Sequence, residues 1–111
     1  MKNFPRRGEI FWVNLDPTIG TEAKKIRPGL VLSNDIGNEC SSRVIIAPIT
    51  SSINTVYPFE AKIVIHKKEN KVMLDQIRTV DKARIGNLIS NITDTELKKV
   101  EKALKLVLDI A

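Results

Sequence analysis

Short apolar runs alternate with clusters of polar and turn-forming residues along most of the chain, and only the C-terminal part departs from this pattern. The runs are rich in β-branched and aromatic residues, which is typical of strands. The predicted strands cover residues 8–16, 27–34, 42–50, 59–67 and 71–80 (bent near Gln76), with a small strand after a short turn or helix within residues 81–89. Loops or turns are predicted at residues 17–25, 34–38, 51–58 and 67–71.

Two of the predicted strands differ in how their apolar residues are arranged. Residues 42–50 are apolar on both faces, which predicts burial on both faces. Pro48 indicates that pairing stops near the end of this strand, because proline has no N–H to donate. The strand over residues 59–67 alternates instead, and its inward side is predicted to consist of Ala61, Ile63 and Ile65.

A helix is predicted over residues 93–111, because apolar residues recur there at helical spacing. The apolar stripe consists of Leu97, Val100, Leu104, Val107, Leu108 and Ala111. Thr93 and Glu96 fit a capping box, and Glu101 with Lys105 has the spacing of a favourable ion pair. The lysines on the other face of this helix are interpreted as a solvated surface.

These elements together predict a mainly β (α+β) fold. Five to seven short strands and one long helix in about 110 residues favour a small, strongly bent antiparallel sheet or barrel. The C-terminal helix would cover an open face of that sheet. The absence of a linker, repeat or low-complexity tract favours a single domain over residues 1–111.

Composition narrows the class of protein further. The chain is 42% hydrophobic and 28% charged, as in ordinary globular domains, and no apolar run approaches the ~20 residues that span a bilayer. No apolar signal segment follows the basic residues at the N-terminus, so a cytoplasmic location without membrane association is expected. Cys40 and His66 are each the single residue of their type, so neither a disulfide, a metal site nor a metal cofactor is expected.

The formal net charge of +5 favours a polyanionic partner, either a nucleic acid or an acidic protein segment. The basic residues are spread along the chain and do not form a single cluster.

Four segments, in this order, carry a resemblance to a known family: RGEIFWVNLDPTIGTEAKKIRPGLVLSNDIGN, VIIAPIT, LDQIRTVDKARI and the terminal helix. From Arg7 to about Leu108 the chain resembles the MazF/PemK toxins of bacterial toxin–antitoxin pairs. The resemblance implies an SH3-like barrel of the MazF/CcdB type that forms a two-fold homodimer. It also implies a cofactor-free, metal-independent endoribonuclease that cuts single-stranded RNA at short sequences. Its implied partner is a cognate antitoxin with a disordered, acidic tail.

Arg27 stands at the junction of the loop and the strand that begins at Pro28, and two roles fit it there. Its planar guanidinium matches phosphate oxygens, and the fixed backbone would aim it. Alternatively, it pairs with a carboxylate and closes the end of the barrel. The resemblance favours the first role, because the Arg-Pro pair at this place carries the family's catalytic arginine.

Two further positions are candidates for the chemistry of RNA cleavage. A hydroxyl at Thr50 would bond a phosphate oxygen or, alternatively, satisfy a backbone group at the strand end; the resemblance places this threonine at the scissile phosphate. Asp75 is a candidate general base, because a guanidinium stays protonated and cannot accept a proton. Relatives that use this acid have a second arginine two residues before it, where this chain has Met73.

The remaining candidates would contact RNA. Gln76 could read a base edge, and Arg78 is expected to hold the barrel together or to contact a backbone phosphate. The resemblance implies RNA contacts for Thr21 and Glu22. The neighbouring Lys24 and Lys25 are expected to strengthen phosphate attraction.

Aromatic residues are few, and two of them lie near the second loop. Tyr57 and Phe59 are candidates for stacking on bases, whereas Phe11 and Trp12 fit core or dimer contacts.

A non-catalytic inhibitor of DNA gyrase, as in the CcdB toxins, is the alternative function. Those inhibitors rely on a Trp-Gly-Ile-like C-terminal tail, and this chain ends in LKLVLDIA. A generic basic RNA-binding barrel would explain the charge, but not the Arg-Pro and APIT motifs together.

Overall fold

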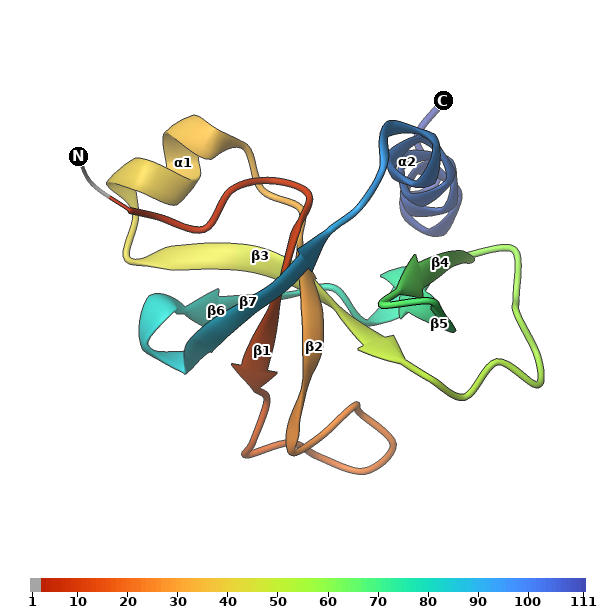
Figure 1. Ribbon diagram of the computed structural model, residues 1–111, viewed down its shortest axis with the longest axis horizontal. Coiled ribbons are helices and arrows are strands. Elements are labelled where there is room, and N and C mark those ends of the chain that lie inside the picture. The colour runs from red at the N-terminus through yellow and green to blue at the C-terminus, as the bar shows by residue number, and fades with distance from the viewer. Residues whose placement is uncertain (1–2) are drawn as a thin grey trace.

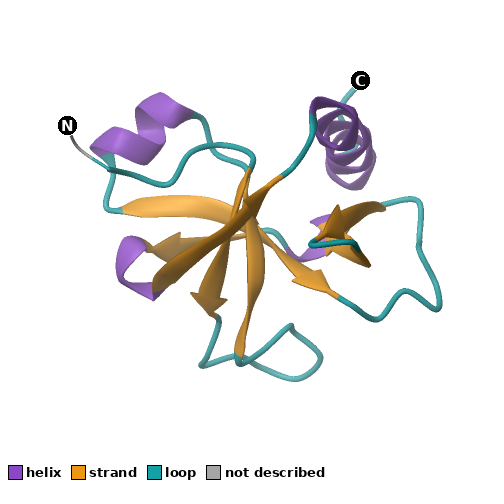
Figure 2. Cartoon of the chain, viewed as in Figure 1, coloured by secondary structure: helices purple, strands orange, loops and turns teal. Residues whose placement is uncertain are grey.

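A computed structural model describes residues 3–111 of the chain, which contain seven strands, two α-helices and two short 3-10 turns (Figures 1 and 2). The strands are β1 (Glu9–Asn14), β2 (Ile26–Val31), β3 (Arg43–Thr50), β4 (Glu60–Ile65), β5 (Lys68–Met73), β6 (Arg78–Asp81) and β7 (Ile85–Asn91). The helices are α1 (Asp35–Cys40) and α2 (Asp94–Leu108), and the 3-10 turns are η1 (Leu74–Gln76) and η2 (Lys82–Arg84).

The strands form one curled antiparallel sheet in the order β4-β5-β3-β2-β1-β7, with β6 also paired to β3. Strand β3 is central because its first half pairs with β6, and its last residues pair with β5. His66, at the turn between β4 and β5, places Nε2 3.1 Å from the carbonyl oxygen of Ile89 in β7. The two ends of the strand order therefore approach each other, and the predicted mainly β barrel with a C-terminal helix is confirmed.

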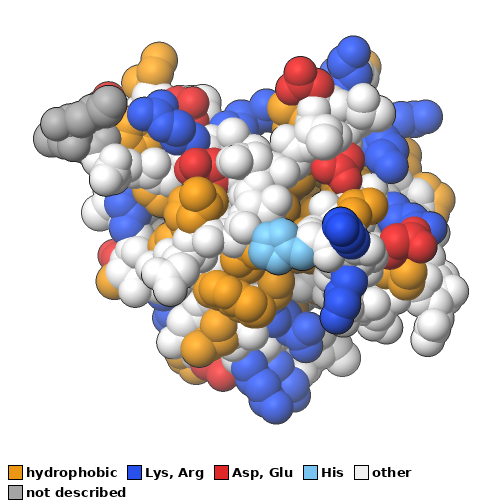
Figure 3. All heavy atoms as spheres, in the orientation of Figure 1, with side chains coloured by type: hydrophobic (Ala, Val, Ile, Leu, Met, Phe, Trp, Pro, Cys, Tyr) orange, Lys and Arg blue, Asp and Glu red, His pale blue; other side chains and the backbone are white. Residues whose placement is uncertain are grey.

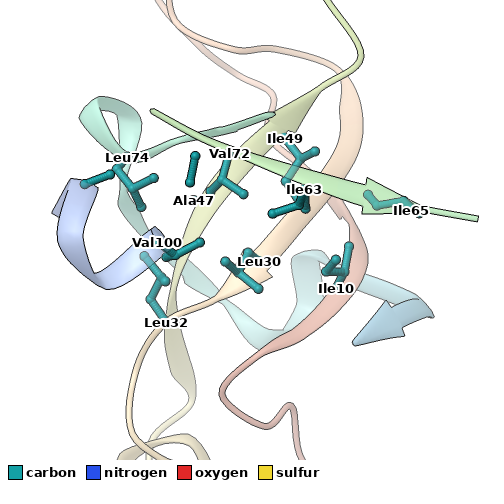
Figure 4. Close-up of a cluster of buried hydrophobic side chains, with 12 residues drawn as sticks. Ile10, Leu30, Leu32, Ala47, Ile49, Ile63, Ile65, Val72, Leu74 and Val100 are labelled. Carbon is teal, nitrogen blue, oxygen red and sulfur yellow. The ribbon is translucent and has the colours of Figure 1, made fainter. Parts of the chain in front are cut away.

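Alternation along β3 divides the interior into two clusters. Ala47 and Ile49 point into a cluster that also contains Leu30, Val72 and the α2 residue Val100 (Figure 4). Helix α2 covers this cluster. Burial of apolar surface in this cluster is the main source of stability of the folded chain, because each Å² removed from water contributes roughly 25 cal/mol.

The other face of β3 carries the second cluster. Val44 and Ile46 pack there against Val13, Leu15 and Val31. Pro48 and Thr50 are the next positions on this face, since side chains of a strand alternate between faces. Burial of β3 on both faces is thus confirmed for its second half, whereas Ile45 is 40% exposed.

Helix α2 begins with the predicted capping box: Thr93 accepts from the N–H of Glu96, and Glu96 accepts from the N–H of Thr93. Val100 of the predicted stripe is fully buried, but Leu108 is 48% exposed near the end of the helix. Glu101 pairs with Arg7 at 3.1 Å. Glu101 therefore pairs with Arg7, which is distant in the sequence, and not with Lys105 as predicted.

Two predicted turns were wrong. Residues 34–38 lie mostly in α1, because Asn34 caps that helix by accepting from the N–H of Gly37 at 2.8 Å. Residues 67–71 belong largely to β5, and the reversal of the chain is confined to His66 and Lys67, which have positive φ angles of 48° and 68°. In both places, the polar residues that suggested a turn belong to the exposed beginning of a helix or strand.

The predicted strand over residues 71–80 is two strands separated by η1, which contains the expected bend at Gln76. Within residues 3–111, neither helix is long and apolar enough to cross a lipid bilayer.

Candidate active site

Two adjoining pockets open where β2 begins and β3 ends, beside the loop between β1 and β2 (the first loop, residues 15–25). The arginine pocket, of about 280 Å³, is lined by Gly20, Thr21, Glu22, Ala23, Lys24, Arg27, Thr50, Met73 and Gln76. The aspartate pocket, of about 520 Å³, is lined by Pro17, Ile19, Thr21, Glu22, Ala23, Pro48, Asp75, Gln76, Ile77 and Arg78. Four residues line both pockets, so the two pockets adjoin each other.

Arg27 and Thr50 meet in the arginine pocket because of the register between β2 and β3. Gly29 is paired with Pro48 in that ladder, and Arg27 and Thr50 lie two positions beyond this last pair. Gly29 itself has no room for a side chain, since a Cβ there would lie 2.8 Å from Cγ2 of Val13. This close approach of β1 to β2 fixes the backbone that carries Arg27.

Arg27 is partly buried, and its Nε donates to the carbonyl oxygen of Lys24 at 3.1 Å. None of the ion pairs formed within residues 3–111 includes Arg27. The alternative in which Arg27 closes the barrel through a carboxylate is therefore absent from the described part of the chain. Arg27 lines the pocket, where its planar guanidinium can bond two oxygens of a phosphate.

Thr50 is half-buried at the end of β3, and its Oγ accepts from the N–H of Ser52 at 3.2 Å. This contact is the local role that a strand-end threonine often has. It uses only the acceptor side of the hydroxyl, so the hydroxyl proton can still be donated to an oxygen in the pocket.

Gln76 joins the two pockets and ties the first loop to η1. Its Oε1 accepts from the N–H of Ala23 at 2.7 Å, and its Nε2 lies 3.5 Å from Sδ of Met73. The side chain of Gln76 therefore holds the loop in place, a role that the sequence did not indicate.

Asp75 is exposed at the aspartate pocket, on the same 3-10 turn as Gln76. Arg78 lines that pocket and donates from Nη1 to the carbonyl oxygen of Leu15 at 3.0 Å. Of the two roles expected for Arg78, this contact supports the structural one, because it holds the backbone at the start of the first loop.

The predicted RNA-contacting residues of the first loop differ in whether they line the pockets. Thr21 and Glu22 line both pockets, and Lys24 lines the arginine pocket. Lys25 lines neither; it has a positive φ of 68°, and its N–H donates to Asp16 Oδ1 at 2.9 Å. Basic side chains nevertheless gather at the lower tip of the molecule, where the first loop lies in Figure 1 (Figure 3).

Several lining residues were not predicted because they carry no reactive group. Pro48 and Ile77 form apolar walls, and Ala23 contributes the N–H that Gln76 binds. Their only signal in the sequence is that they flank Thr50, Gln76 and the first loop.

A guanidinium and a hydroxyl thus line one pocket, and a carboxylate lines the pocket beside it. The first two can hold a phosphate and stabilise negative charge on its oxygens, and the third can accept a proton. Within residues 3–111, no three His, Cys, Asp or Glu side chains lie close enough together to hold a metal ion.

The fold and the pockets together define a small β-barrel protein with a pocket lined by an arginine and a threonine where β2 begins and β3 ends. The sequence profile of the PemK-like, MazF-like toxins of type II toxin–antitoxin systems matches residues 6–108. The chain belongs to this family, as its motifs indicated.

Relatives and solved structures agree with this assignment. The chain is 36% identical over 108 residues to "Endoribonuclease EndoA" of Bacillus subtilis, covering 93% of each chain. It superimposes on the crystal structure of MazF from Deinococcus radiodurans with a TM-score of 0.87 and 28% identity, covering 98% of this chain and all of the other. A MazE–MazF complex from the same organism matches with a TM-score of 0.79 and 25% identity, over 99% and 100% of the two chains.

Proposed function

We propose that this protein is the endoribonuclease toxin of a toxin–antitoxin pair and cuts single-stranded RNA without a metal ion, by attack of the 2′-hydroxyl on the neighbouring phosphorus. The convergence of Arg27 and Thr50 in one pocket is the observation that carries the proposal. The family and the endoribonuclease relative support it. They do not favour the gyrase-inhibitor alternative.

In the proposed mechanism, the scissile phosphate lies in the arginine pocket. Arg27 donates to the non-bridging oxygens and stabilises the charge that grows on them in the phosphorane. Thr50 donates its hydroxyl proton to one of these oxygens and fixes the orientation of the phosphate. Lys24 adds positive charge at the same pocket.

Asp75 is the proposed acceptor of the proton that the 2′-hydroxyl loses as its oxygen bonds to phosphorus. The bond from phosphorus to the 5′-oxygen breaks, and this oxygen leaves with a proton taken from water. Asp75 is exposed in the pocket adjoining Arg27, on the turn that also carries Gln76. Asp75→Asn should slow cleavage about 10²-fold or more if this carboxylate is the base. An unchanged single-turnover rate would assign that step to another group.

The direct test of the proposed reaction is to incubate the purified protein with a long single-stranded RNA in EDTA and to map the ends. We expect cuts at a short recurring sequence, with 2′,3′-cyclic phosphate or 3′-phosphate ends. Cleavage that stops on chelation and returns with Mg²⁺ would contradict the proposed mechanism.

We also propose a homodimer. Phe11 in β1 is paired with Leu88 in β7, and Leu88 is 51% exposed on that face; Trp12, on the other face of β1, is 45% exposed, so apolar side chains are left uncovered on these strands. Light scattering should give about twice the chain mass of 12.5 kDa. A fully active monomer would contradict this proposal.

The proposed inhibitor is a cognate antitoxin with an acidic, disordered tail. The MazE–MazF structure from Deinococcus radiodurans and the +5 charge of this chain support such a partner. The tail should compete with RNA, and less strongly at high salt. Simultaneous binding of tail and RNA would show that they use different surfaces.

A further inference from the structure

A buried ion pair holds the loop between β3 and β4 (the second loop, residues 51–59), and the proposed mechanism does not use it. Lys71 Nζ lies 2.9 Å from Glu60 Oε1, and the two side chains are only 10% and 6% exposed. Lys71 Nζ also donates to the carbonyl oxygen of Thr55 at 2.6 Å, and Glu60 Oε1 accepts from the N–H of Tyr57 at 2.9 Å. The pair therefore fixes the backbone of the second loop at two points.

The ion pair lies next to the arginine pocket. Lys71 is paired with Thr50 across β3 and β5, and Glu60 is paired with Met73 across β4 and β5. Residues directly opposite each other in an antiparallel ladder point to the same face. Because Thr50 and Met73 both line the arginine pocket, Lys71 and Glu60 occupy the neighbouring positions on that face.

The second loop carries two aromatic rings in a fixed arrangement. The rings of Tyr57 and Phe59 are stacked, with centroids 5.3 Å apart and planes inclined by 5°. Lys71 Nζ lies 5.7 Å from the centroid of Tyr57, so the ion pair also contacts the ring pair. Tyr57 remains 51% exposed. An exposed ring that is already ordered can stack on an unpaired base with little further loss of conformational entropy.

We propose that Lys71 and Glu60 are positioning residues that hold the Tyr57–Phe59 pair as a stacking surface for an unpaired RNA base beside the scissile phosphate. This inference rests on the proposed RNA-cleaving function. Glu60 neutralises the charge of Lys71, so the pair acts on RNA through the geometry of the second loop. It does not act by attracting phosphate.

The test measures RNA binding in an Arg27→Ala background, in which the probe stays intact. The probe is a short single-stranded RNA that contains the mapped cleavage site and a 2-aminopurine beside it, whose fluorescence falls on stacking. Tyr57→Leu and the double variant Lys71→Met/Glu60→Gln should each weaken binding roughly tenfold and abolish the fluorescence decrease. Combining all three substitutions should weaken binding no further, because the substitutions remove the same contact.

The matched control is Lys62→Met/Glu69→Gln, which removes an exposed ion pair of 2.6 Å from the same two strands. It should leave binding and fluorescence unchanged. The Lys71/Glu60 double variant removes both charges together, so it leaves no unpaired charge buried, and thermal unfolding checks that it folds.

Two results would overturn the inference. One is wild-type binding by the folded Lys71/Glu60 double variant. The other is an unchanged fluorescence decrease in Tyr57→Leu, which tests the stacking surface independently of the ion pair. Failure of the proposed function is distinguishable from both, because the unmodified protein would then leave the long RNA uncut.

Discussion

The first loop lines both pockets, and the second loop begins directly after Thr50 of the arginine pocket, but the two loops are held by different interactions. The first loop is tied down by single hydrogen bonds, such as those from Ala23 to Gln76 and from Arg78 to Leu15. The second loop is held by one buried ion pair between Lys71 and Glu60. A typical hydrogen bond contributes about 1 kcal/mol, whereas removing one partner of a buried pair costs about 3–5 kcal/mol.

This difference suggests a division of roles. The first loop contributes charged and polar side chains around the proposed phosphate site, and it can adjust to the substrate because its contacts are individually weak. The second loop is rigid and carries rings in place of charges. Substitutions around the first loop should therefore change cleavage more than stability, and substitutions beneath the second loop should change stability as well.

The largest effect is expected for Arg27→Ala. Removal of the guanidinium should lower the single-turnover cleavage rate roughly 10²–10³-fold, because it stabilises charge in the transition state. The thermal unfolding midpoint should barely change, since Arg27 forms none of the ion pairs within residues 3–111. Arg43→Ala is the matched control, because Arg43 is an exposed arginine at the opposite end of β3, and it should cut normally.

The second prediction concerns stability. Lys71→Met leaves the carboxylate of Glu60 buried without its partner, and it should lower the free energy of unfolding by about 3 kcal/mol. Urea titration measures this change. Adding Glu60→Gln to the same chain should recover part of the loss. A Lys71→Met protein as stable as the wild type would show that the second loop is not held by this pair.

A smaller effect is expected for Gln76→Met, which keeps the size of the side chain but cannot accept from the N–H of Ala23. The first loop should become more mobile. We expect single-turnover cleavage to slow roughly tenfold, because misplaced groups lose part of their orientation. Stability should fall by only about 1 kcal/mol. If the free energy of unfolding fell by more than the activation free energy of cleavage rose, the two loops would not differ in the way described.

The smallest effect is expected for Lys24→Ala. Loss of one cation at the arginine pocket should weaken RNA binding a few-fold and reduce the slope of log affinity against log salt by about 0.7. Titrations at several salt concentrations measure this slope. Lys25→Ala should change it less, because Lys25 lines neither pocket.

Alternation and helical spacing were sufficient to predict most of the fold. Ala61, Ile63 and Ile65 are buried as their spacing indicated, and the capping box at Thr93 is present. Helix α1 was missed because its cap and turn residues are the same types that form reverse turns.

The candidate site was predictable in part. Arg27 and Thr50 were predicted as site residues because their motifs resemble those of a family. The register of β2 against β3 brings the two residues together. The Lys71–Glu60 ion pair could not be predicted from the sequence, because a lysine in a polar stretch resembles a solvated surface residue. Its burial depends on the second loop folding back over β5, a contact between segments distant in sequence.

The central claim is that the guanidinium of Arg27 stabilises the transition state and does more than attract RNA. Arg27→Lys tests it most directly, because an ammonium keeps the charge but lacks the planar pair of donors. Single-turnover cleavage, RNA affinity and thermal unfolding should be measured on one preparation. RNA affinity and stability should stay close to those of the wild type, whereas cleavage should slow roughly 10²-fold or more. Cleavage near the wild-type rate by Arg27→Lys would contradict this claim.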